Sequence, residues 1–306
     1  MISPRPAARS TVTALTPGVI AAIIVTMLAW SSAFVVIRGV GPHFGGGSLA
    51  LARLLVGSVV LGLILLAYRR AWVRPTGREW VLISGFGVAW FGAYNVALNI
   101  AEQTLDAGTT AMLINIAPIF LAVGAGIILR EGIPRWLAIG GAVSFLGVIV
   151  IGLATKRTDE TEGLGTDIGV VWCLIAAVTY TVGVLMQKPA LRRLPAAQVT
   201  FMGCVIGTLA CLPFSGELVS DVASAPLAAI SGAVYLGVVP TALAFSTWAF
   251  ALARIPAGQL GISTYVVPPL AILLGFLAFG EVPPVAAVFG GALCLAGVAV
   301  SRIRSR

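Results

Sequence analysis

Long apolar stretches alternate with short polar ones along almost the whole chain. A helix that crosses a lipid bilayer needs about 20 consecutive apolar residues, and the apolar stretches have this length. The pattern predicts ten such spans, over residues 17–37, 48–68, 80–100, 107–129, 134–154, 167–187, 198–214, 227–250, 256–279 and 284–301. We therefore expect an all-α polytopic membrane protein of ten transmembrane helices, in contact with the lipid bilayer.

The composition narrows the possibilities further. Only 10% of the 306 residues are charged, 59% are hydrophobic and the mean hydropathy is +1.04. These values exclude a disordered chain, a coiled coil and a water-soluble enzyme. The net charge of +8 does not indicate a nucleic-acid partner, because the basic residues lie in short loops and no segment is typical of a nucleic-acid-binding module.

The basic residues also predict the orientation of the chain in the membrane. Loops on the cytoplasmic side carry an excess of Lys and Arg. With the N-terminus inside, most basic residues fall on the cytoplasmic side: Arg5, Arg9, Arg69, Arg70, Arg74, Arg78, Arg130, Arg135, Lys188, Arg192, Arg193, Arg254, Arg302, Arg304 and Arg306. Ten spans then place both termini in the cytoplasm.

A repeat at an offset of 150 residues divides the chain in two. Pro118 matches Pro268, Glu131 matches Glu281, and Gly140-Gly141-Ala142 matches Gly290-Gly291-Ala292. The division predicts two five-helix units, residues 1–154 and 155–306. Because five is odd, the second unit must enter the membrane from the opposite side. Inverted repeats around a central cavity are typical of transporters that work by alternating access.

Several short motifs support the same interpretation. They are Leu28–Phe34 (LAWSSAF), Arg53, Pro118, Arg130-Glu131, Tyr235–Ala244 (YLGVVPTALA), Gly280-Glu281 and the Gly-Gly-Ala…Gly-Val endings of both halves. With these motifs the chain resembles a ten-helix exporter of the EamA type, in the drug/metabolite transporter superfamily. The resemblance implies a multi-pass protein of the bacterial inner membrane. It also implies a cavity lined by the first, third and fourth helices of each half.

Aromatic and polar residues inside the spans are the candidates for contact with a solute. Asn95, Asn99 and Glu102 share one helix face, and lipid does not accept unpaired amides, so this face must point inward. The full set of substrate-binding candidates is Trp30, Trp90, Tyr94, Asn95, Asn115, Tyr180, Ser246, Trp248, Ser263 and Tyr265. The alternatives are interfacial or core packing for the aromatic residues and hydrogen bonds between helices for the amides.

Pro118 and Pro268 occupy equivalent positions in the fourth span of each half. A proline inside a helix removes one hydrogen bond and permits a kink. We expect the two prolines to act as hinges or gates, with static bends as the alternative.

Four charged residues lie in or beside the spans. We expect Arg53 to form an ion pair with Glu102 or Asp106, and the alternative is capture of a substrate carboxylate. Glu102 is expected at the outer rim, solvated or paired. Glu131 and Glu281 are expected to be structural, either pairing with nearby basic groups or capping the helices that begin at 134 and 284.

The function expected from these residues is export of small organic solutes by alternating access, most simply amino acids with apolar or aromatic side chains. Purines, flat organic cations or drugs are alternative substrates, and a channel or a lipid-handling protein is an alternative class. The single His43 and the scattered cysteines indicate no metal, no cofactor and no catalytic residues. The oligomeric state is open, and a monomer is compatible with the sequence.

Overall fold

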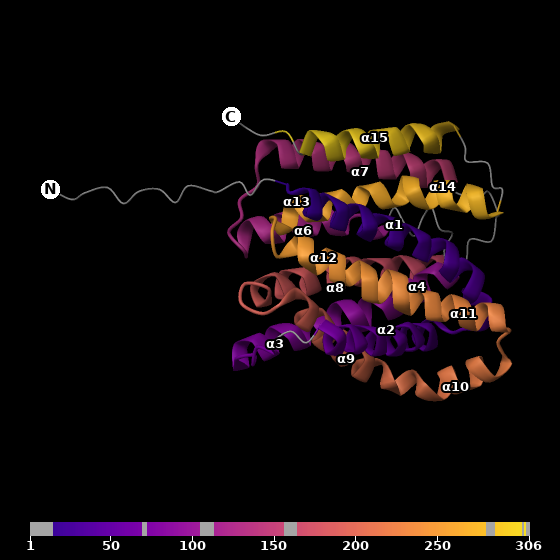
Figure 1. Ribbon diagram of the computed structural model, residues 1–306. Helices are drawn as coiled ribbons and strands as arrows, with labels where there is room; N and C mark the ends of the chain where they lie inside the picture. Colours follow the sequence, from indigo (N-terminus) through magenta and orange to yellow (C-terminus); the bar gives the residue numbers. More distant parts are fainter. Residues whose placement is uncertain are drawn as a thin grey trace.

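The computed structural model describes residues 15–68, 72–104, 113–155, 164–279, 285–301 and 303 as a bundle of roughly parallel and antiparallel helices (Figure 1). The helices of the first half are α1 (Pro17–Val40), α2 (Gly46–Tyr68), α3 (Gly77–Phe86) continued by a π-helix, η2 (Gly87–Tyr94), and α4 (Asn95–Thr104), then α6 (Ala117–Ile127) and α7 (Arg135–Thr155). A short 3₁₀ turn, η1 (Gly41–His43), joins α1 to α2.

The second half repeats this order. Its helices are α8 (Leu164–Ala190), α9 (Ala196–Cys211) with η3 (Leu212–Phe214) and α10 (Ser215–Ser224), α11 (Leu227–Leu236) with the π-helix η4 (Gly237–Leu243) and α12 (Ala244–Leu252), α13 (Ala257–Ile262) with the 3₁₀ turn η5 (Ser263–Val266) and α14 (Val267–Phe279), and α15 (Val285–Ser301). Equivalent helices run in opposite directions in the two halves. The predicted inverted repeat is confirmed.

The membrane-spanning character also agrees with the prediction. Among the described residues, seven helical segments are long and apolar enough to cross a membrane: Pro17–His43, Gly46–Ala67, Gly77–Gln103, Ile168–Ala190, Ala196–Ser224, Leu227–Leu252 and Ala257–Ala278. Three shorter apolar helices, Ala117–Ile127, Arg135–Val150 and Val288–Ser301, correspond to the remaining expected spans. One boundary differs clearly. The seventh span was expected to end at 214, but the amphipathic α10 continues the helix to Ser224. In this helix Asp221 accepts hydrogen bonds from Gly45 in the α1–α2 connection and from Ser48 at the start of α2.

The bundle has two ends, the Glu131 end and the Glu102 end. The Glu131 end, on the left in Figure 1, is where α3, α7, α9 and α13 begin. Eight of the ten described Lys and Arg residues lie there, all except Arg38 and Arg53: Arg74, Arg78, Arg130, Arg135, Lys188, Arg192, Arg193 and Arg254. The Glu102 end is the opposite one, where α4 and α10 end.

Hydrogen bonds between residues 150 positions apart locate the axis that relates the halves. A residue on a two-fold axis meets its own equivalent. The hydroxyls of Ser58 and Thr208 lie 3.0 Å apart, between α2 and α9. On the opposite side of the bundle the Ser144 hydroxyl donates to the Cys294 carbonyl at 3.1 Å, between α7 and α15. The pseudo-two-fold axis therefore passes through both helix pairs and through the space between them.

Small residues bring α7 and α15 unusually close together. A Cβ atom on Gly140 would lie 2.5 Å from the Gly297 carbonyl oxygen, and a Cβ on Gly297 would lie 2.5 Å from the Gly140 oxygen. Gly147 faces the Gly290 carbonyl in the same way. Larger side chains would push these backbones apart, so the glycine faces predicted by the repeat serve helix packing.

The prolines of the fourth spans give a different local structure from the kinks that we expected. Pro118 lies in the first turn of α6, after a turn at Asn115, and Pro268 lies in the first turn of α14, after η5. Because proline has no N–H and fits the first helical turn best, each proline begins a new helix. The α-helix of each fourth span is thus interrupted just before its proline, by a turn in the first half and by the 3₁₀ turn η5 in the second.

Candidate functional site

A cavity lies in the middle of the bundle, beside the pseudo-two-fold axis. Its free volume is about 80 Å³, enough for several water molecules. Its lining consists of Trp30, Ala33, Phe34, Ile37, Arg53, Trp90, Tyr94, Asn95, Leu98, Glu102, Ile114, Asn115, Ala117, Pro118, Tyr180, Phe245, Thr264 and Val267. Most of these residues come from the halves of their helices nearer the Glu102 end, so the cavity extends from the centre toward that end.

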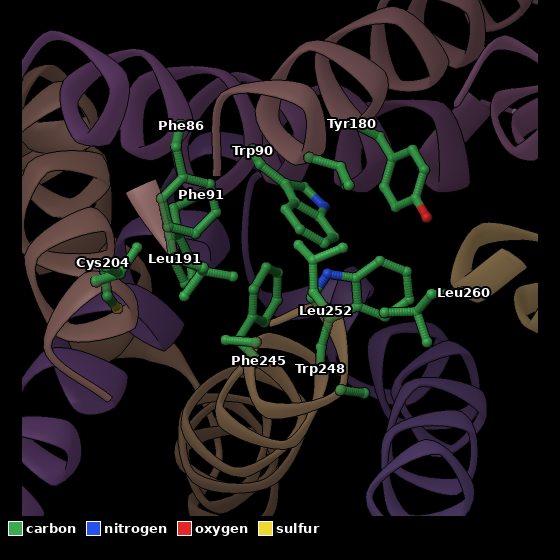
Figure 2. Packing of buried hydrophobic residues seen from close by; sticks show 14 of the residues in the cluster. Phe86, Trp90, Phe91, Tyr180, Leu191, Cys204, Phe245, Trp248, Leu252 and Leu260 are labelled. Atoms are coloured by element: carbon green, nitrogen blue, oxygen red, sulfur yellow. The ribbon is translucent and has the colours of Figure 1, made fainter. Parts of the chain in front are cut away.

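Aromatic rings from both halves form the inner wall of the cavity. Trp90 is at their centre, with ring centroids 4.9 Å from Tyr180, 4.8 Å from Phe245 and 5.9 Å from Trp30. Figure 2 shows Tyr180, Phe245 and Trp248 around Trp90. Most of the pairs are edge-to-face or tilted, the arrangements that aromatic rings prefer. The interlocked rings fix a rigid apolar surface facing the cavity.

Polar contacts hold two residues of this wall in place. The indole N–H of Trp30 donates to the Pro240 carbonyl at 3.2 Å. The side-chain amide of Asn95 donates to the Phe91 carbonyl at 2.8 Å and to the Trp90 carbonyl at 3.3 Å. All three acceptors lie in π-helices, whose altered hydrogen-bond pattern provides these carbonyl groups. The amide nitrogen of Asn95 is thus engaged, which leaves its side-chain oxygen as the group that can serve a ligand.

Arg53 and Glu102 contribute charges to the same cavity. Arg53 is only 3% exposed, and its Nε donates to the Thr241 hydroxyl at 3.1 Å. The Nη1 of Arg53 and the Oε1 of Glu102 are enclosed and have no hydrogen-bond partner among the described residues. No ion pair joins the two side chains in the described part of the chain. The expected ion pair of Arg53 is therefore not formed with Glu102, and the alternative partner Asp106 lies outside the described residues. Glu102 is half-buried and lines the cavity, with one of its carboxylate oxygens enclosed.

The other candidate residues divide into two groups. Trp30, Trp90, Tyr94, Asn95, Asn115 and Tyr180 lie in the cavity lining. Ser246, Trp248, Ser263 and Tyr265 lie outside it. Trp248 is fully buried behind Trp30 and Trp90, and Tyr265 packs instead against the α7–α15 side of the bundle. The 3₁₀ turn η5 changes which face of the segment points inward, so Thr264 takes the place expected for Tyr265.

Eight apolar lining residues were absent from the sequence-based candidates, namely Ala33, Phe34, Ile37, Leu98, Ile114, Ala117, Phe245 and Val267. They are apolar residues within apolar helices, so hydropathy alone does not distinguish them from lipid-facing or core positions. For Phe245 a signal did exist: it is the repeat equivalent of Asn95.

The Glu131 end is closed by contacts to the connection between α12 and α13. Lys188 donates to the Ile255 carbonyl at 2.6 Å and also to that of Leu252. The Glu131 carboxylate accepts the backbone N–H of Ala257 at 2.7 Å. We expected Glu131 to be structural, either pairing with nearby basic groups or capping the helix that begins at 134. The carboxylate interacts electrostatically with Lys188 and Arg192, and it accepts from the first turn of α13 in the other half rather than from the helix at 134. Partial burial is the main influence on this carboxyl group and raises its pKa. Its repeat mate Glu281 lies outside the described residues.

No group of three His, Cys, Asp or Glu side chains that could hold a metal ion occurs in the described ranges. The Cys173, Cys204, Cys211 and Cys294 thiols are all free and buried.

Comparison with known proteins identifies relatives over nearly the whole chain. A model of the EamA-like transporter family matches residues 16–153 and again residues 167–303. A probable terminal-alkyne amino-acid exporter of Streptantibioticus cattleyicolor is 37% identical over 90% of this chain and 91% of that protein. The uncharacterized transporter YdfC of Bacillus subtilis is 31% identical over 90% of this chain and 88% of that protein. A solved crystal structure has a TM-score of 0.74 at 18% identity, covering 93% of this chain and 96% of that one, which shows a shared fold.

Proposed function

Because the chain belongs to the EamA-like transporter family, we propose that it exports amino acids with apolar or aromatic side chains across the bacterial inner membrane. The family and the fold make it a multi-pass membrane transporter of small solutes. The observation that carries the finer proposal is the cavity itself, in which a rigid wall of Trp30, Trp90, Tyr180 and Phe245 lies beside a few polar groups. Such a wall suits an apolar or aromatic side chain, and one relative is described as an amino-acid exporter.

The orientation follows from the basic residues. The Glu131 end carries most of the described Lys and Arg residues, so we assign it to the cytoplasm together with both termini. The cavity then extends toward the outside and the closed end faces the cytoplasm. This arrangement corresponds to an outward-facing state, from which an exporter releases its substrate. Cysteine labelling at Gly216 and at Arg78 in intact cells tests it: an impermeant reagent should reach the first and not the second.

The transport proposal is tested in liposomes that contain the purified protein. Counterflow uptake of labelled phenylalanine, tryptophan and leucine should exceed that of empty liposomes and should saturate with concentration. Saturation would exclude a channel. Uptake of labelled adenine or a flat organic cation, with none of the amino acids, would contradict the substrate proposal while leaving the family assignment intact.

Substitutions at Tyr94, Asn95 and Asn115 test the binding role of the lining. Each residue lines a different part of the cavity, so alanine at each position should change the relative uptake of competing amino acids unequally. The amount of folded protein, measured by fluorescence-detected gel filtration, should change less. Parallel losses of folded protein in all three variants would instead show that these residues serve helix packing.

We infer that the two fourth spans move at the points where their α-helices are interrupted. Pro118 lies in the first turn of α6 and Pro268 in the first turn of α14. Neither proline has the backbone N–H that would donate a hydrogen bond to the preceding turn. We assign these breaks as the hinges of alternating access. Pro118→Ala and Pro268→Ala should then shift the accessibility of cysteines at the two mouths in opposite directions. Equal shifts in both variants, or unchanged accessibility with normal transport, would show static breaks.

A further inference from the structure

A buried arginine and a half-buried glutamate line one cavity and form no ion pair with each other. A charged group inside an apolar bundle is costly unless an opposite charge or several hydrogen bonds satisfy it. Among the described residues Arg53 has one such bond, from Nε to Thr241, and its Nη1 has no partner there. Glu102 has an enclosed and unpartnered Oε1. The described residues therefore do not fully satisfy the guanidinium group of Arg53 or the carboxylate of Glu102, and both groups line the cavity.

The chemistry of the two groups defines what would satisfy both. A guanidinium group binds a carboxylate through two parallel N–H donors, and a carboxylate accepts N–H donors from an ammonium group. A single ligand meets both needs only if it carries a carboxylate and an ammonium close together. An α-amino acid in its zwitterionic form is such a ligand. A simple organic cation would satisfy Glu102 and leave Arg53 unpaired, and a simple anion would do the reverse.

The position of the pair relative to the aromatic wall fits the same ligand. Glu102 lies eight residues after Tyr94 on α4, which is about 12 Å along the helix at about 1.5 Å per residue. Trp90 and Tyr180 lie deeper, toward the centre of the bundle. A ligand whose charged head lies between Arg53 and Glu102 directs its side chain inward, past Tyr94 and toward the tryptophans.

We propose that Arg53 and Glu102 form a zwitterion clamp, in which Arg53 binds the carboxylate and Glu102 binds the ammonium of a free α-amino acid. This inference rests on the proposed function and makes it more specific. The amides and aromatic rings of the cavity select the side chain, whereas the clamp requires that both charges of the head group be present. Peptide-linked, decarboxylated or deaminated forms of the same compounds are then poor substrates.

Three compounds with the same phenyl group distinguish the two charges: phenylalanine, 2-phenylethylamine and 3-phenylpropionate. Their affinities are measured by competition against labelled phenylalanine in counterflow and, independently, by quenching of tryptophan fluorescence in detergent. The native protein should bind phenylalanine about tenfold or more tightly than either single-charge analogue, since a hydrogen-bonded charge that is lost costs at least this much.

Each variant should abolish the preference of the protein for one of the two charged groups of phenylalanine. In Arg53→Gln the affinity for phenylalanine should fall about tenfold, to that of 2-phenylethylamine. In Glu102→Gln it should fall to that of 3-phenylpropionate. Arg78→Gln and Glu217→Gln, which make the same chemical changes at exposed positions of α3 and α10, should preserve the native order. If Arg53→Gln gives no folded protein, Arg53→Lys is used instead, because lysine keeps the positive charge but lacks the two parallel N–H donors. This variant should lower the affinity for phenylalanine more than that for 2-phenylethylamine.

The outcomes separate the two proposals. A native protein that transports no amino acid would refute the proposed function. A native protein that transports phenylalanine, but whose Arg53 and Glu102 variants keep the native order of the three compounds, would refute the clamp alone. The clamp would also be refuted if Glu102→Gln stopped net export but bound the three compounds with the same order of affinities as the native protein. Glu102 would then be assigned to proton coupling instead.

Discussion

The third helical segments of the two halves share one backbone and carry different side chains. Residues 77–104 and 227–252 both cross the bundle as an α-helix, a π-helix and a second α-helix, and the two π-helices begin at equivalent glycines, Gly87 and Gly237. On the inner face, however, Asn95, Asn99 and Glu102 in the first half correspond to Phe245, Ala249 and Leu252 in the second.

This difference shows that the scaffold and the site follow separate rules. The π-helices occur in both halves because each must fit against the same neighbours across the axis. Within these two segments the amide and carboxylate side chains occur in the first half only, because a cavity that binds a solute with distinct polar and apolar ends needs unlike walls. The next four experiments test this division, beginning with the largest effect.

Position 90 and its equivalent position 240 should respond very differently to alanine. Trp90 is 1% exposed and contacts four other aromatic rings besides Phe86. Trp90→Ala should lower the free energy of unfolding by about 3–5 kcal/mol, the usual cost of removing a buried aromatic side chain. Pro240→Ala should cost much less, because the backbone carbonyl that accepts the Trp30 indole stays in place. Unfolding in graded denaturing detergent measures both, and equal losses would contradict the division.

The hydroxyl of Thr241 links the second π-helix to the charge in the cavity. It donates to the Leu236 carbonyl at 2.8 Å and accepts from Arg53 Nε. Thr241→Val keeps the shape and removes both bonds, so it should cost about 1.5–3 kcal/mol, the range for hydrogen bonds to charged groups. Thr241→Ser retains the hydroxyl and is the matched control. If valine and serine behave alike, the hydroxyl has no role in holding Arg53.

Asn99→Ala makes the first half resemble the second at this position. The Asn99 amide donates to the Gly46 carbonyl at 3.0 Å, which ties α4 to the start of α2. Its loss should lower stability by about 1 kcal/mol. Gln103→Ala removes a comparable bond to the Phe44 carbonyl at the exposed end of α4 and should cost less. A thermal-stability comparison in one detergent checks the order, and the reverse order would show that burial does not set the cost here.

The smallest effect concerns pH and the carboxylate that joins the halves. Burial raises the pKa of Glu131 above its ordinary 4.5. The folded protein therefore holds this proton more tightly than the unfolded chain does. The resulting stabilisation is complete below pH 4.5 and is lost as the pH rises through the folded pKa. Glu131→Gln should flatten this part of the stability profile, and Glu217→Gln should leave it unchanged. A profile that Glu131→Gln does not alter would contradict the assignment.

The fold could be predicted from the sequence, because the lengths of the apolar stretches and the matched Pro, Glu and Gly residues each have a single structural interpretation. The position of Tyr265 could not be predicted in the same way. It depends on the turn η5, which rotates the inner face by a fraction of a helical turn, and such rotations leave no trace in hydropathy. The separation of Arg53 from Glu102 was likewise out of reach. Whether two charges on neighbouring helices touch depends on how the helices cross.

The contacts on the two-fold axis also have a consequence for the origin of the chain. Ser58 meets Thr208, and Ser144 meets Cys294, each residue touching its own counterpart. Contacts of this kind are isologous, the type that two identical subunits make in a homodimer. In such a dimer every substitution appears twice, and a lone Glu102 without a second copy is impossible. Duplication and fusion of the gene remove that restriction. Joined in one chain, the two halves keep the dimer's scaffold and become free to diverge into a one-sided binding site.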